Sequence, residues 1–453
     1  MTEHEDGEGS GSPPGGARQR GMIAARTGLK VGGNYARYLS RRATGADRDE
    51  ARADLHTRNA EDLFTELSKL RGTALKMAQG LSMEPGMLPG QFADILSKAQ
   101  YEVPAMGPAL VHRLVAQAFG MPPQEAFAAF DLTAMAAASL GQVHRARLHD
   151  GTDVVVKVQY PNVRESVDSD LKMVRALAGR FVDLHLLDPY VEEVRERMME
   201  ETDYINEGRN IEQFAARYAN SSIVTPRWVE ARTTERVLTM THVDGQHLKA
   251  FLATEPSRER RNHFGQLLWD TVHEQVASDH LSVHADPHPG NFLFREDGTL
   301  GLLDFGCIKV FPRAFRDHLL GLYRARMAGD TAAQKRAYEA LDMLPADLDG
   351  EERTYLMEIL DAFGGMIQSL YEQDMYDFST GELLSRFQDI MPRLTGREAF
   401  QHRRPVGSHH FVFVNRLLVG LFSMMTQLGA RVDVRHARRC LEQVRPDSLM
   451  PVG

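Results

Sequence analysis

The sequence predicts an α+β fold with two lobes, of which the smaller is built on antiparallel strands and the larger on helices. Hairpin patterns at 145–159 and 292–303 indicate the strands, and helical periodicity dominates the chain after residue 306. A long helical pattern precedes the first hairpin and adds a helical extension. The expected parts are a disordered tail at 1–21, the helical extension at 22–130, the strand-containing lobe at 131–245 and the helical lobe at 246–453.

Composition excludes several classes of protein. The net charge is −9 over 453 residues, whereas a general nucleic-acid-binding protein would carry a basic excess. The two cysteines, Cys307 and Cys440, provide no disulfide framework and fit a reducing compartment. The chain has no apolar run of about 18 residues and no apolar stretch near its start. We therefore expect a cytoplasmic protein without a transmembrane helix or a secretory signal peptide.

Residues 22–42 differ from the rest of the chain, because basic side chains alternate with apolar ones and Asp and Glu are missing. A basic amphipathic segment of this kind can lie on an anionic membrane surface. A helix packed against the body of the protein fits the same pattern, and the adjacent Gly32 and Gly33 weaken the helix prediction. Both interpretations stay open. The first would give peripheral contact with the inner membrane.

Residues 283–306 contain three polar groups that phosphoryl transfer requires. Asp286 can orient a hydroxyl or a water molecule and accept its proton, Asn291 can hold one Mg²⁺, and Asp304 can hold the Mg²⁺ that bridges phosphates. The catalytic loop of protein kinases has the same spacing between its Asp and Asn, and it is followed later by Asp-Phe-Gly. Here Asp304 begins such a triplet. The stretch therefore indicates a site for ATP and Mg²⁺.

The segment between Asn291 and Asp304 predicts a hairpin with strands at Phe292–Phe294 and Leu300–Leu303. A hairpin would bring the two side chains next to each other, as the ligands of neighbouring Mg²⁺ ions require. The alternative for Asp304 is an ordinary Asx turn at the end of a strand.

His284 and His288 are four residues apart, a spacing that on a helix would suggest a pair of metal ligands. Pro287 and Pro289 argue against a helix at this position. We therefore interpret both histidines as residues that brace the loop.

An Asp-Gly turn between two β-rich runs predicts the first hairpin, with Lys157 in its second strand. The Val-Val-Val-Lys pattern resembles the kinase strand whose Lys contacts the α- and β-phosphates. A solvated Lys on an edge strand is the alternative. Small residues precede the hairpin and could bring backbone N–H groups close to phosphates; they are Ala136, Ala137, Ala138 and Ser139.

Strand-like runs at 224–229 and 236–240 are expected to complete the sheet of the smaller lobe. The segment 241–245 that follows would be the hinge between the lobes, where the backbone takes the adenine. The adenine contacts expected there are Met240, His242 and Val243.

A buried Lys157 needs a carboxylate partner. The acid-rich run at 190–218 is expected to be one helix and is the candidate source. The other expected helices are at 54–80, 108–119, 123–130, 163–187, 247–279, 314–328, 331–341, 351–371, 381–390 and 411–428.

Taken together, these motifs resemble those of the UbiB/AarF/ADCK family of atypical kinase-like proteins. The resemblance rests on Lys76 and Gln79, with Ala78 where the family usually has Gly, and on the residue groups at 136–144, 156–157, 201–203, 284–291 and 304–306. It implies a protein-kinase-like fold with an Ala-rich loop in place of the Gly-rich one. It also implies that Lys76 and Gln79 in the helical extension cover the active site, and that the protein binds ATP with a divalent metal.

Two carboxylates, Glu201 and Glu207, could pair with Lys157, and six residues apart on a helix they face in different directions. We expect Glu207 to be the partner, with Glu201 and Asp203 facing Lys76.

The activity that the resemblance implies is an ATPase or a small-molecule or lipid kinase, coupled to ubiquinone or other isoprenoid-lipid metabolism. Its expected ligands are a nucleotide and a lipid or quinone precursor. An ATP-responsive scaffold without turnover is the alternative. A protein kinase is disfavoured, because no Ala-Pro-Glu motif and no long activation segment follow Gly306.

Overall fold

The computed structural model describes residues 33–42, 55, 58, 105–138, 140–178, 184–345, 348, 350–395, 407–408 and 410–443. The predicted tail at 1–21, Lys76, Gln79, Ser139 and nearly all of the predicted helix at 54–80 lie outside this range. The chain forms two compact units, one from residues up to 106 with 137–142 and 159–199, the other from the remaining residues. Within the described part of the chain, no helix is both long and apolar enough to cross a membrane.

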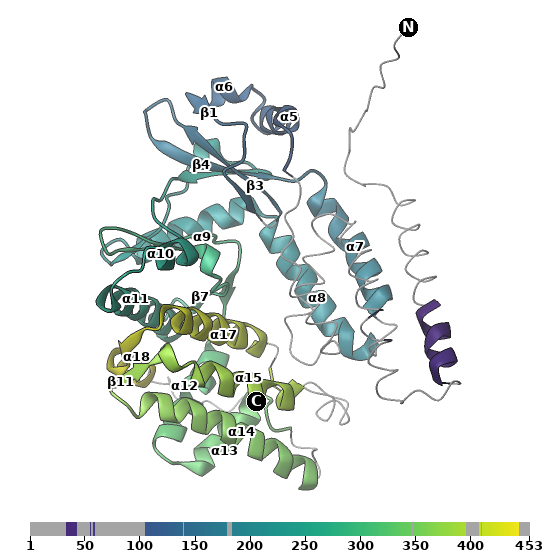
Figure 1. Ribbon diagram of the computed structural model, residues 1–453, viewed down its shortest axis with the longest axis vertical. Helices are drawn as coiled ribbons and strands as arrows, with labels where there is room; N and C mark the ends of the chain where they lie inside the picture. The colour runs from purple at the N-terminus through teal and green to yellow at the C-terminus, as the bar shows by residue number, and fades with distance from the viewer. Residues whose placement is uncertain are drawn as a thin grey trace. The chain divides into compact units, whose positions relative to one another are not determined.

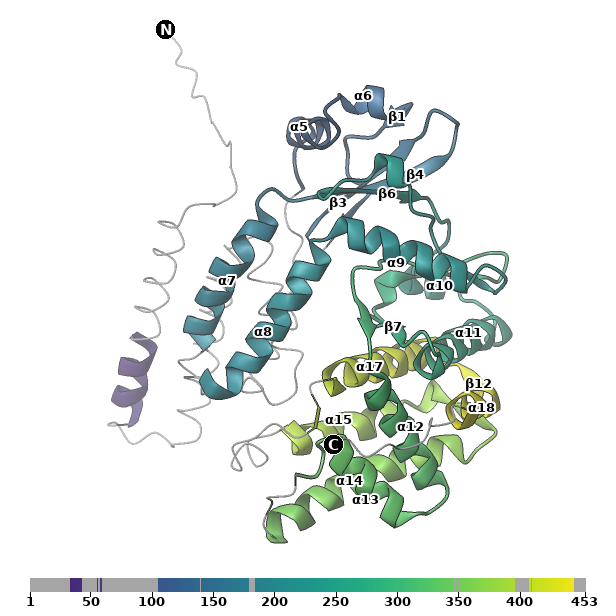
Figure 2. The same cartoon turned by 180° about the vertical axis from the view of Figure 1, so that it is seen from behind.

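The first unit contains two helices that lie side by side, α7 (Val163–Ala178) and most of α8 (Leu184–Glu201) (Figures 1 and 2). An ion pair joins them, with 2.7 Å between Arg195 Nε and Asp168 Oδ1. The sequence predicted one helix at 163–187, whereas the structure ends α7 at Ala178. Residues 33–42 of the same unit are helical, and none of them is fully buried.

The predicted antiparallel sheet is present, with strand order β1-β3-β4-β6 and β2 as its fifth strand, and apart from residues 137–142 and 159 it belongs to the second unit. The first hairpin is confirmed: β3 and β4 flank the turn, and Gly151 adopts the φ of 91° that favours glycine there. Helix α6 contacts β1, and α9 contacts β6. The strands are β1 (Ala129–Phe130), β2 (Ala136–Ala138), β3 (Gly141–Arg147), β4 (Asp153–Gln159) and β6 (Val237–Thr241).

One expectation for this region was wrong, and another holds in part. Ala136–Ala138 forms strand β2 rather than a loop. The run at 224–229 divides at Pro226: Val224 belongs to β5 (Ile223–Val224), which pairs in parallel with β9 (Leu300–Leu302) in a separate three-stranded sheet. Trp228 instead pairs with Met240 of β6, and the N–H of Val229 donates to the carbonyl oxygen of Thr239 at 2.9 Å, so this part of the run does border the predicted sheet.

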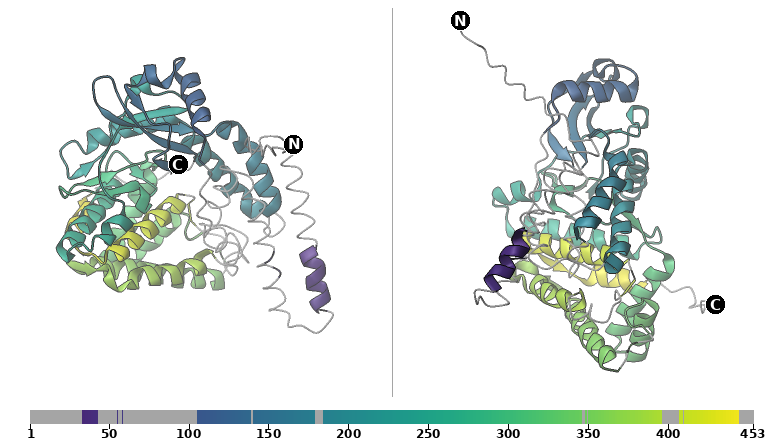
Figure 3. Two further views of the ribbon diagram at one scale, coloured as in Figure 1. Left: turned by 45° about the horizontal axis from the view of Figure 1, so that its top comes forward. Right: turned by 90° about the vertical axis from the view of Figure 1, so that its right-hand side faces the viewer.

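Helices make up most of the second unit, and they form one apolar core around Trp269, Phe305 and Phe422. Figure 3 shows the last helices of the chain, in yellow, among the green helices that precede them. The helices are α5 (Pro108–Phe119), α6 (Pro123–Ala126), α9 (Tyr204–Arg217), α10 (Leu248–Ala253), α11 (Arg258–Ala277), α12 (Arg313–Met327), α13 (Thr331–Ala340), α14 (Gly350–Tyr371), α15 (Glu382–Thr395), α17 (Phe411–Leu428) and α18 (Arg435–Gln443).

The five helices predicted between 314 and 428 are confirmed, with small shifts of their ends. Three runs that were each predicted to be one continuous helix are shorter or divided in the structure. For the first two, a capping residue explains the break. The run at 190–218 breaks where Asp203 caps α9 by accepting from Asn206 N at 3.0 Å. The run at 247–279 breaks after Pro256, where Ser257 caps α11. The helix expected at 123–130 ends at Ala126, and the chain continues as β1. The sequence interpretation missed α18 and the pair β11 (Met375–Asp377) and β12 (Arg431–Asp433).

The core of the second unit encloses a histidine. His273 Nδ1 lies 2.6 Å from the carbonyl oxygen of Trp269, and Nε2 contacts the hydroxyl of Tyr371. Burial lowers the pKa of His273 to about 4 from an ordinary value of 6.5. The side chain is therefore neutral in the folded protein at neutral pH.

This shift predicts a pH-dependent stability. Between the two pKa values the unfolded chain binds a proton on His273 and the folded chain does not. The free energy of unfolding is therefore unaffected by His273 above pH 6.5 and falls as the pH drops toward about 4. The loss attributable to His273 is about 3 kcal/mol. Urea denaturation across this window should show a shallower pH slope for His273→Gln than for the wild type. The matched control His318→Gln, on α12, should keep the wild-type slope, and parallel curves for His273→Gln would contradict the assignment.

Candidate functional site

A hairpin positions the first two candidate residues. Strand β8 (Phe292–Phe294) pairs antiparallel with β9, so the predicted hairpin is confirmed. The N–H of Leu303 donates to the Asn291 carbonyl at 2.8 Å, which places Asn291 beside the residue that precedes Asp304. Gly301 allows the strands to approach closely, because a Cβ there would lie 2.9 Å from Leu293 Cβ.

Lys157 is a buried cation on an inner strand, so the edge-strand alternative is wrong. It lies on β4, between β3 and β6, and its side chain is 8% exposed. Its Nζ lies 3.0 Å and 3.1 Å from the two carboxylate oxygens of Glu207 and 3.6 Å from Asp304 Oδ2. The structure thus brings together the three side chains that the sequence assigned to one cluster.

The charges of this cluster support one another. Burial opposes the charged form of Lys157, but the carboxylates of Asp304 and Glu207 outweigh burial and hold the pKa of Lys157 above its usual value. Burial also raises the pKa of Glu207, and the nearby ammonium opposes that rise. The side chain of Asp304 is 39% exposed, so it is the member of the cluster that a ligand can reach.

Helix α9 holds this cluster through one face. Glu207, Asn210 and Phe214 recur at helical spacing on that face. Asn210 Nδ2 donates to the carbonyl oxygen of Phe305 at 3.0 Å, and the rings of Phe214 and Phe305 lie 5.4 Å apart. The same helix that pairs with Lys157 therefore also fixes the Asp-Phe-Gly triplet.

Asp304 faces Lys157 and also forms the Asx turn that the sequence offered as its alternative role. Its Oδ1 accepts from the N–H of Gly306 at 3.2 Å, as in an Asx turn, while its Oδ2 faces Lys157. Its φ is +55°, in the left-handed region that Asp tolerates better than most residues. A Cβ at Gly306 would lie 3.2 Å from Asp304 Oδ1 and 3.8 Å from Glu201 Cγ, so Glu201 lies beside the triplet.

The carboxylate of Asp286 is held from two sides. Its Oδ1 lies 2.6 Å from Arg416 Nη2, and its Oδ2 accepts from Asn291 Nδ2 at 3.1 Å. Arg416 lies on α17, and the sequence interpretation missed it. The signal was present, since Arg416 is the single charged residue in an otherwise uncharged helix at 411–428.

The two histidines of the loop make contacts that fit the predicted bracing role. His284 Nε2 lies 2.8 Å from the carbonyl oxygen of Asp304, and His288 Nδ1 accepts from the N–H of Gly290 at 3.0 Å. Among the residues that the structure describes, no group of three or more His, Cys, Asp or Glu side chains could hold a metal.

Other predicted site residues lie in different settings. Met240 is buried on β6, and the N–H of His242 donates to the carbonyl oxygen of Asp153 at 3.0 Å, so that N–H is used within the protein. Val243 lies near the hairpin, since its Cγ1 would be 3.3 Å from a Cβ at Gly301. Asp203 caps α9. The adenine contacts and the cleft-covering roles of Lys76, Gln79, Glu201 and Asp203 stay predictions.

The residues present fit Mg²⁺ bound together with phosphates. The Asn291 amide nitrogen donates to Asp286, which leaves its amide oxygen as a ligand. Asp304 adds one partly exposed carboxylate. Mg²⁺ in nucleotide sites takes one or two protein oxygens and completes its shell with phosphates and water. One carboxylate and one amide match that donor set.

The close contact between α17 and the Asp286 loop generates a prediction. A Cβ at Gly420 would lie 2.4 Å from Pro287 Cγ and 2.6 Å from its carbonyl oxygen, whereas at Gly321 on α12 the nearest atom would be 4.0 Å away. We expect Gly420→Ala to lower the free energy of unfolding by about 1–3 kcal/mol and Gly321→Ala to raise it by roughly 0.5–1 kcal/mol. Denaturation curves of both variants provide the measurement. Equal stabilisation by the two substitutions would show that α17 does not press on the loop.

Comparisons with known proteins identify the family of this chain. Residues 98–338 match the ABC1 atypical kinase-like domain. The chain is 32% identical to "Atypical kinase COQ8, mitochondrial" of Saccharomyces cerevisiae over 65% of this chain and 59% of that protein. It is 30% identical to "AarF domain-containing protein kinase 1" of Mus musculus over 64% of this chain and 57% of that protein.

The chain thus spans little more than half the length of these two relatives. A complex of Rv3197 with erythromycin from Mycobacterium tuberculosis has the same fold, with a TM-score of 0.60 and 24% identity over 89% of this chain and 100% of that one. The bilobal, kinase-like fold class and the family resemblance are confirmed. The chain belongs to the ABC1 family of atypical kinase-like proteins.

Proposed function

We propose that this chain binds ATP with Mg²⁺ and uses it for ATP hydrolysis or for phosphoryl transfer to a small molecule or lipid. One observation carries the proposal: the ammonium of Lys157, held by Glu207, lies 3.6 Å from the carboxylate of Asp304. A buried cation beside a partly exposed carboxylate is the arrangement that orients phosphates and their metal in kinases. The adenine would lie against the segment 240–243.

Each residue then has a defined task. Lys157 has three N–H donors and gives two of them to Glu207, so one remains to bind a phosphate oxygen. Asp304 and Asn291 would hold Mg²⁺, which supplies charge neutralisation at the phosphates when bound. Glu207 positions Lys157 and does not itself reach the nucleotide, since its side chain is 1% exposed.

Asp286 would orient the attacking hydroxyl or water and accept its proton. Arg416 and Asn291 each contact one oxygen of its carboxylate. Arg416 is therefore a positioning residue that fixes the direction of the Asp286 carboxylate.

A small acceptor fits this chain better than a protein acceptor. After Gly306 the chain forms β10 (Ile308–Val310), which pairs with β7 (Ser282–His284), and α12 begins at Arg313. Residues 307–312 leave no room for the long segment that positions a peptide in protein kinases. The family resemblance supports an acceptor or an effector in ubiquinone or other isoprenoid-lipid metabolism.

Peripheral contact with a membrane surface would place the protein near such lipids. In the helix at 33–42, Tyr35 and Leu39 are 55% and 54% exposed. Arg37 lies between them in the sequence, and Arg41 follows Leu39. Exposed apolar and basic side chains on one short helix suit an anionic membrane surface.

The second candidate function is an ATP-responsive scaffold without turnover. The contacts of Asp286 favour it, because both of its carboxylate oxygens already have partners within the protein. A phosphate-release assay with and without anionic vesicles separates the two functions. Nucleotide binding without phosphate release in either condition would favour the scaffold.

We expect Asp304→Asn to reduce Mg²⁺-dependent phosphate release roughly 100-fold or more, because the substitution removes the only carboxylate of the proposed metal site. The matched control is Asp377→Asn on β11, whose side chain is exposed to a similar extent, 35% against 39%. The control should release phosphate at the wild-type rate. Unchanged turnover in Asp304→Asn would refute the metal role of that residue.

A further inference from the structure

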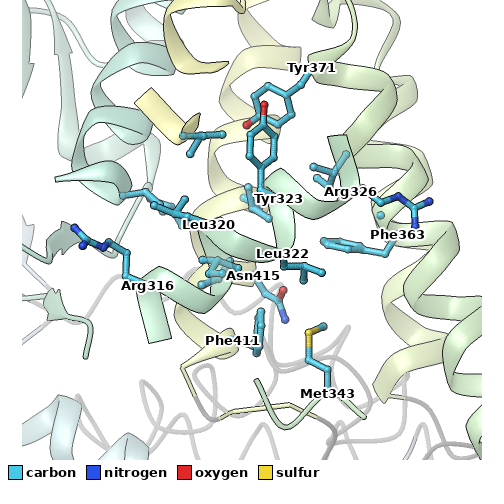
Figure 4. A pocket seen from close by; sticks show the side chains of 18 of the residues that line it. Arg316, Leu320, Leu322, Tyr323, Arg326, Met343, Phe363, Tyr371, Phe411 and Asn415 are labelled. Atoms are coloured by element: carbon cyan, nitrogen blue, oxygen red, sulfur yellow. The ribbon is translucent and has the colours of Figure 1, made fainter. Parts of the chain in front are cut away.

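An apolar cavity lies among the helices of the second unit, apart from the Lys157 cluster. It has a volume of about 230 Å³ and is enclosed mainly by α11, α12, α14 and α17 (Figure 4). An apolar cavity of about 150 Å³ holds benzene, and pockets for drug-sized ligands begin at about 300 Å³. The size therefore suits a small molecule of one or two rings, or one end of a longer one.

The wall of this cavity differs from the core around it. Leu322, Phe363, Val414 and Leu418 line the cavity but are only half-buried, whereas the core proper contains residues with almost no exposure. Half-buried apolar side chains that face a common space gain free energy when an apolar partner covers them. The wall is therefore suited to an apolar ligand.

Two tyrosine rings lie at one end of the cavity. The rings of Tyr323 and Tyr371 lie 5.2 Å apart at this end, where Figure 4 shows both side chains. His273 Nδ1 faces the Trp269 carbonyl, so it carries the hydrogen and leaves Nε2 to accept from the Tyr371 hydroxyl. Tyr371 thus has an acceptor for its hydrogen.

Tyr323 lacks this arrangement. Its hydroxyl oxygen is buried and has no hydrogen-bond partner among the residues that the structure describes. Burial raises the pKa of Tyr323 to about 12, so the hydroxyl keeps its proton and remains a donor. A buried donor without an acceptor costs about 1–3 kcal/mol. Because the oxygen has almost no accessible surface, it does not face the cavity, and Tyr323 contributes its ring to the wall.

The charges at the cavity favour a neutral ligand. Arg316 and Arg326 line it, and both guanidinium groups are already in ion pairs, at 2.7 Å from Asp317 and 2.8 Å from Asp361. Arg326 also lies against α14, where a Cβ at Gly364 would be 3.1 Å from its Cζ. Neither arginine is therefore available to neutralise an anion inside the cavity.

We propose that this cavity is a binding site for a neutral, mostly apolar small molecule. The site does not depend on the proposed function, since none of the residues that hold Lys157 or Asp304 lines it.

Helix α17 connects the cavity to the loop that carries Asp286. Val414 and Leu418 line the cavity, whereas Arg416 and Gly420 contact Asp286 and Pro287. Residues two apart on a helix point about 200° apart, so these pairs occupy opposite faces of α17. A ligand that shifts α17 would therefore change the position of Arg416 relative to Asp286.

Benzophenone provides a direct test, because it is neutral, has two apolar rings and carries one carbonyl oxygen. On irradiation its carbonyl carbon bonds to a nearby C–H carbon and the hydrogen moves to its oxygen. Two methionines line the cavity, Met327 and Met343. In the full chain without nucleotide, we expect saturable labelling of the peptides that contain these residues, located by mass spectrometry. Charged 4-benzoylbenzoate should label them far more weakly.

Two variants test the location of the site. Leu322→Trp should fill the cavity and abolish the labelling, with a thermal melt to confirm that the variant folds. The control Tyr376→Phe, on β11 and outside the cavity lining, should leave the half-saturating benzophenone concentration unchanged.

The opposite outcomes would overturn the proposal. Labelling that does not saturate, or that falls outside the cavity, would show that the cavity does not bind such molecules. If neither methionine of the wild-type protein is labelled, the side chains of the protein themselves fill the cavity. Unchanged labelling in Leu322→Trp would show that benzophenone does not bind in the cavity. Because the assay needs no ATP, its failure would leave the proposed function untouched.

Discussion

The contact between Lys157 and Glu207 is the interaction on which the candidate site depends. Both side chains are almost completely buried, and taking two charges out of water costs several kcal/mol for each ion in real proteins. The two-oxygen contact and the neighbouring Asp304 offset that cost. A buried pair of this kind contributes little net stability but fixes geometry, and here it fixes a cation beside a partly exposed carboxylate.

Helix α9 extends this constraint to the rest of the site. The face that carries Glu207 also carries Asn210 and Phe214, which hold the backbone and the ring of Phe305. From the other direction, the hairpin β8–β9 joins Asn291 to Leu303. Strand β4, helix α9 and the hairpin therefore meet at Asp304, although they lie far apart in the sequence.

Much of this could be predicted from the sequence, because local rules decide it. The hairpin at 292–303 follows from turn residues between alternating apolar positions. The choice of Glu207 as the partner of Lys157 was confirmed but its premise was not, since Glu201 ends α8 and Glu207 lies on α9. The predictions that failed depended on competing local signals. Asp203 and Ser257 cap new helices within runs that are continuous by periodicity alone, and the run at 224–229 divides between two sheets at Pro226.

Contacts between distant segments could not be predicted in the same way. Arg416 pairs with a carboxylate 130 residues earlier, and no local spacing relates the two. The tight approach of Gly420 to Pro287 and the cavity behind α17 both result from how helices pack, which the sequence pattern does not encode directly. A lone charge in an apolar helix was the single hint of this contact.

The most direct test of the central claim is a crystal structure with a non-hydrolysable ATP analogue and Mg²⁺. The account predicts that Lys157 stays paired with Glu207 while its Nζ contacts a phosphate oxygen, and that Asp304 and Asn291 both coordinate the metal. A nucleotide bound elsewhere, or a metal held without Asp304, would contradict it.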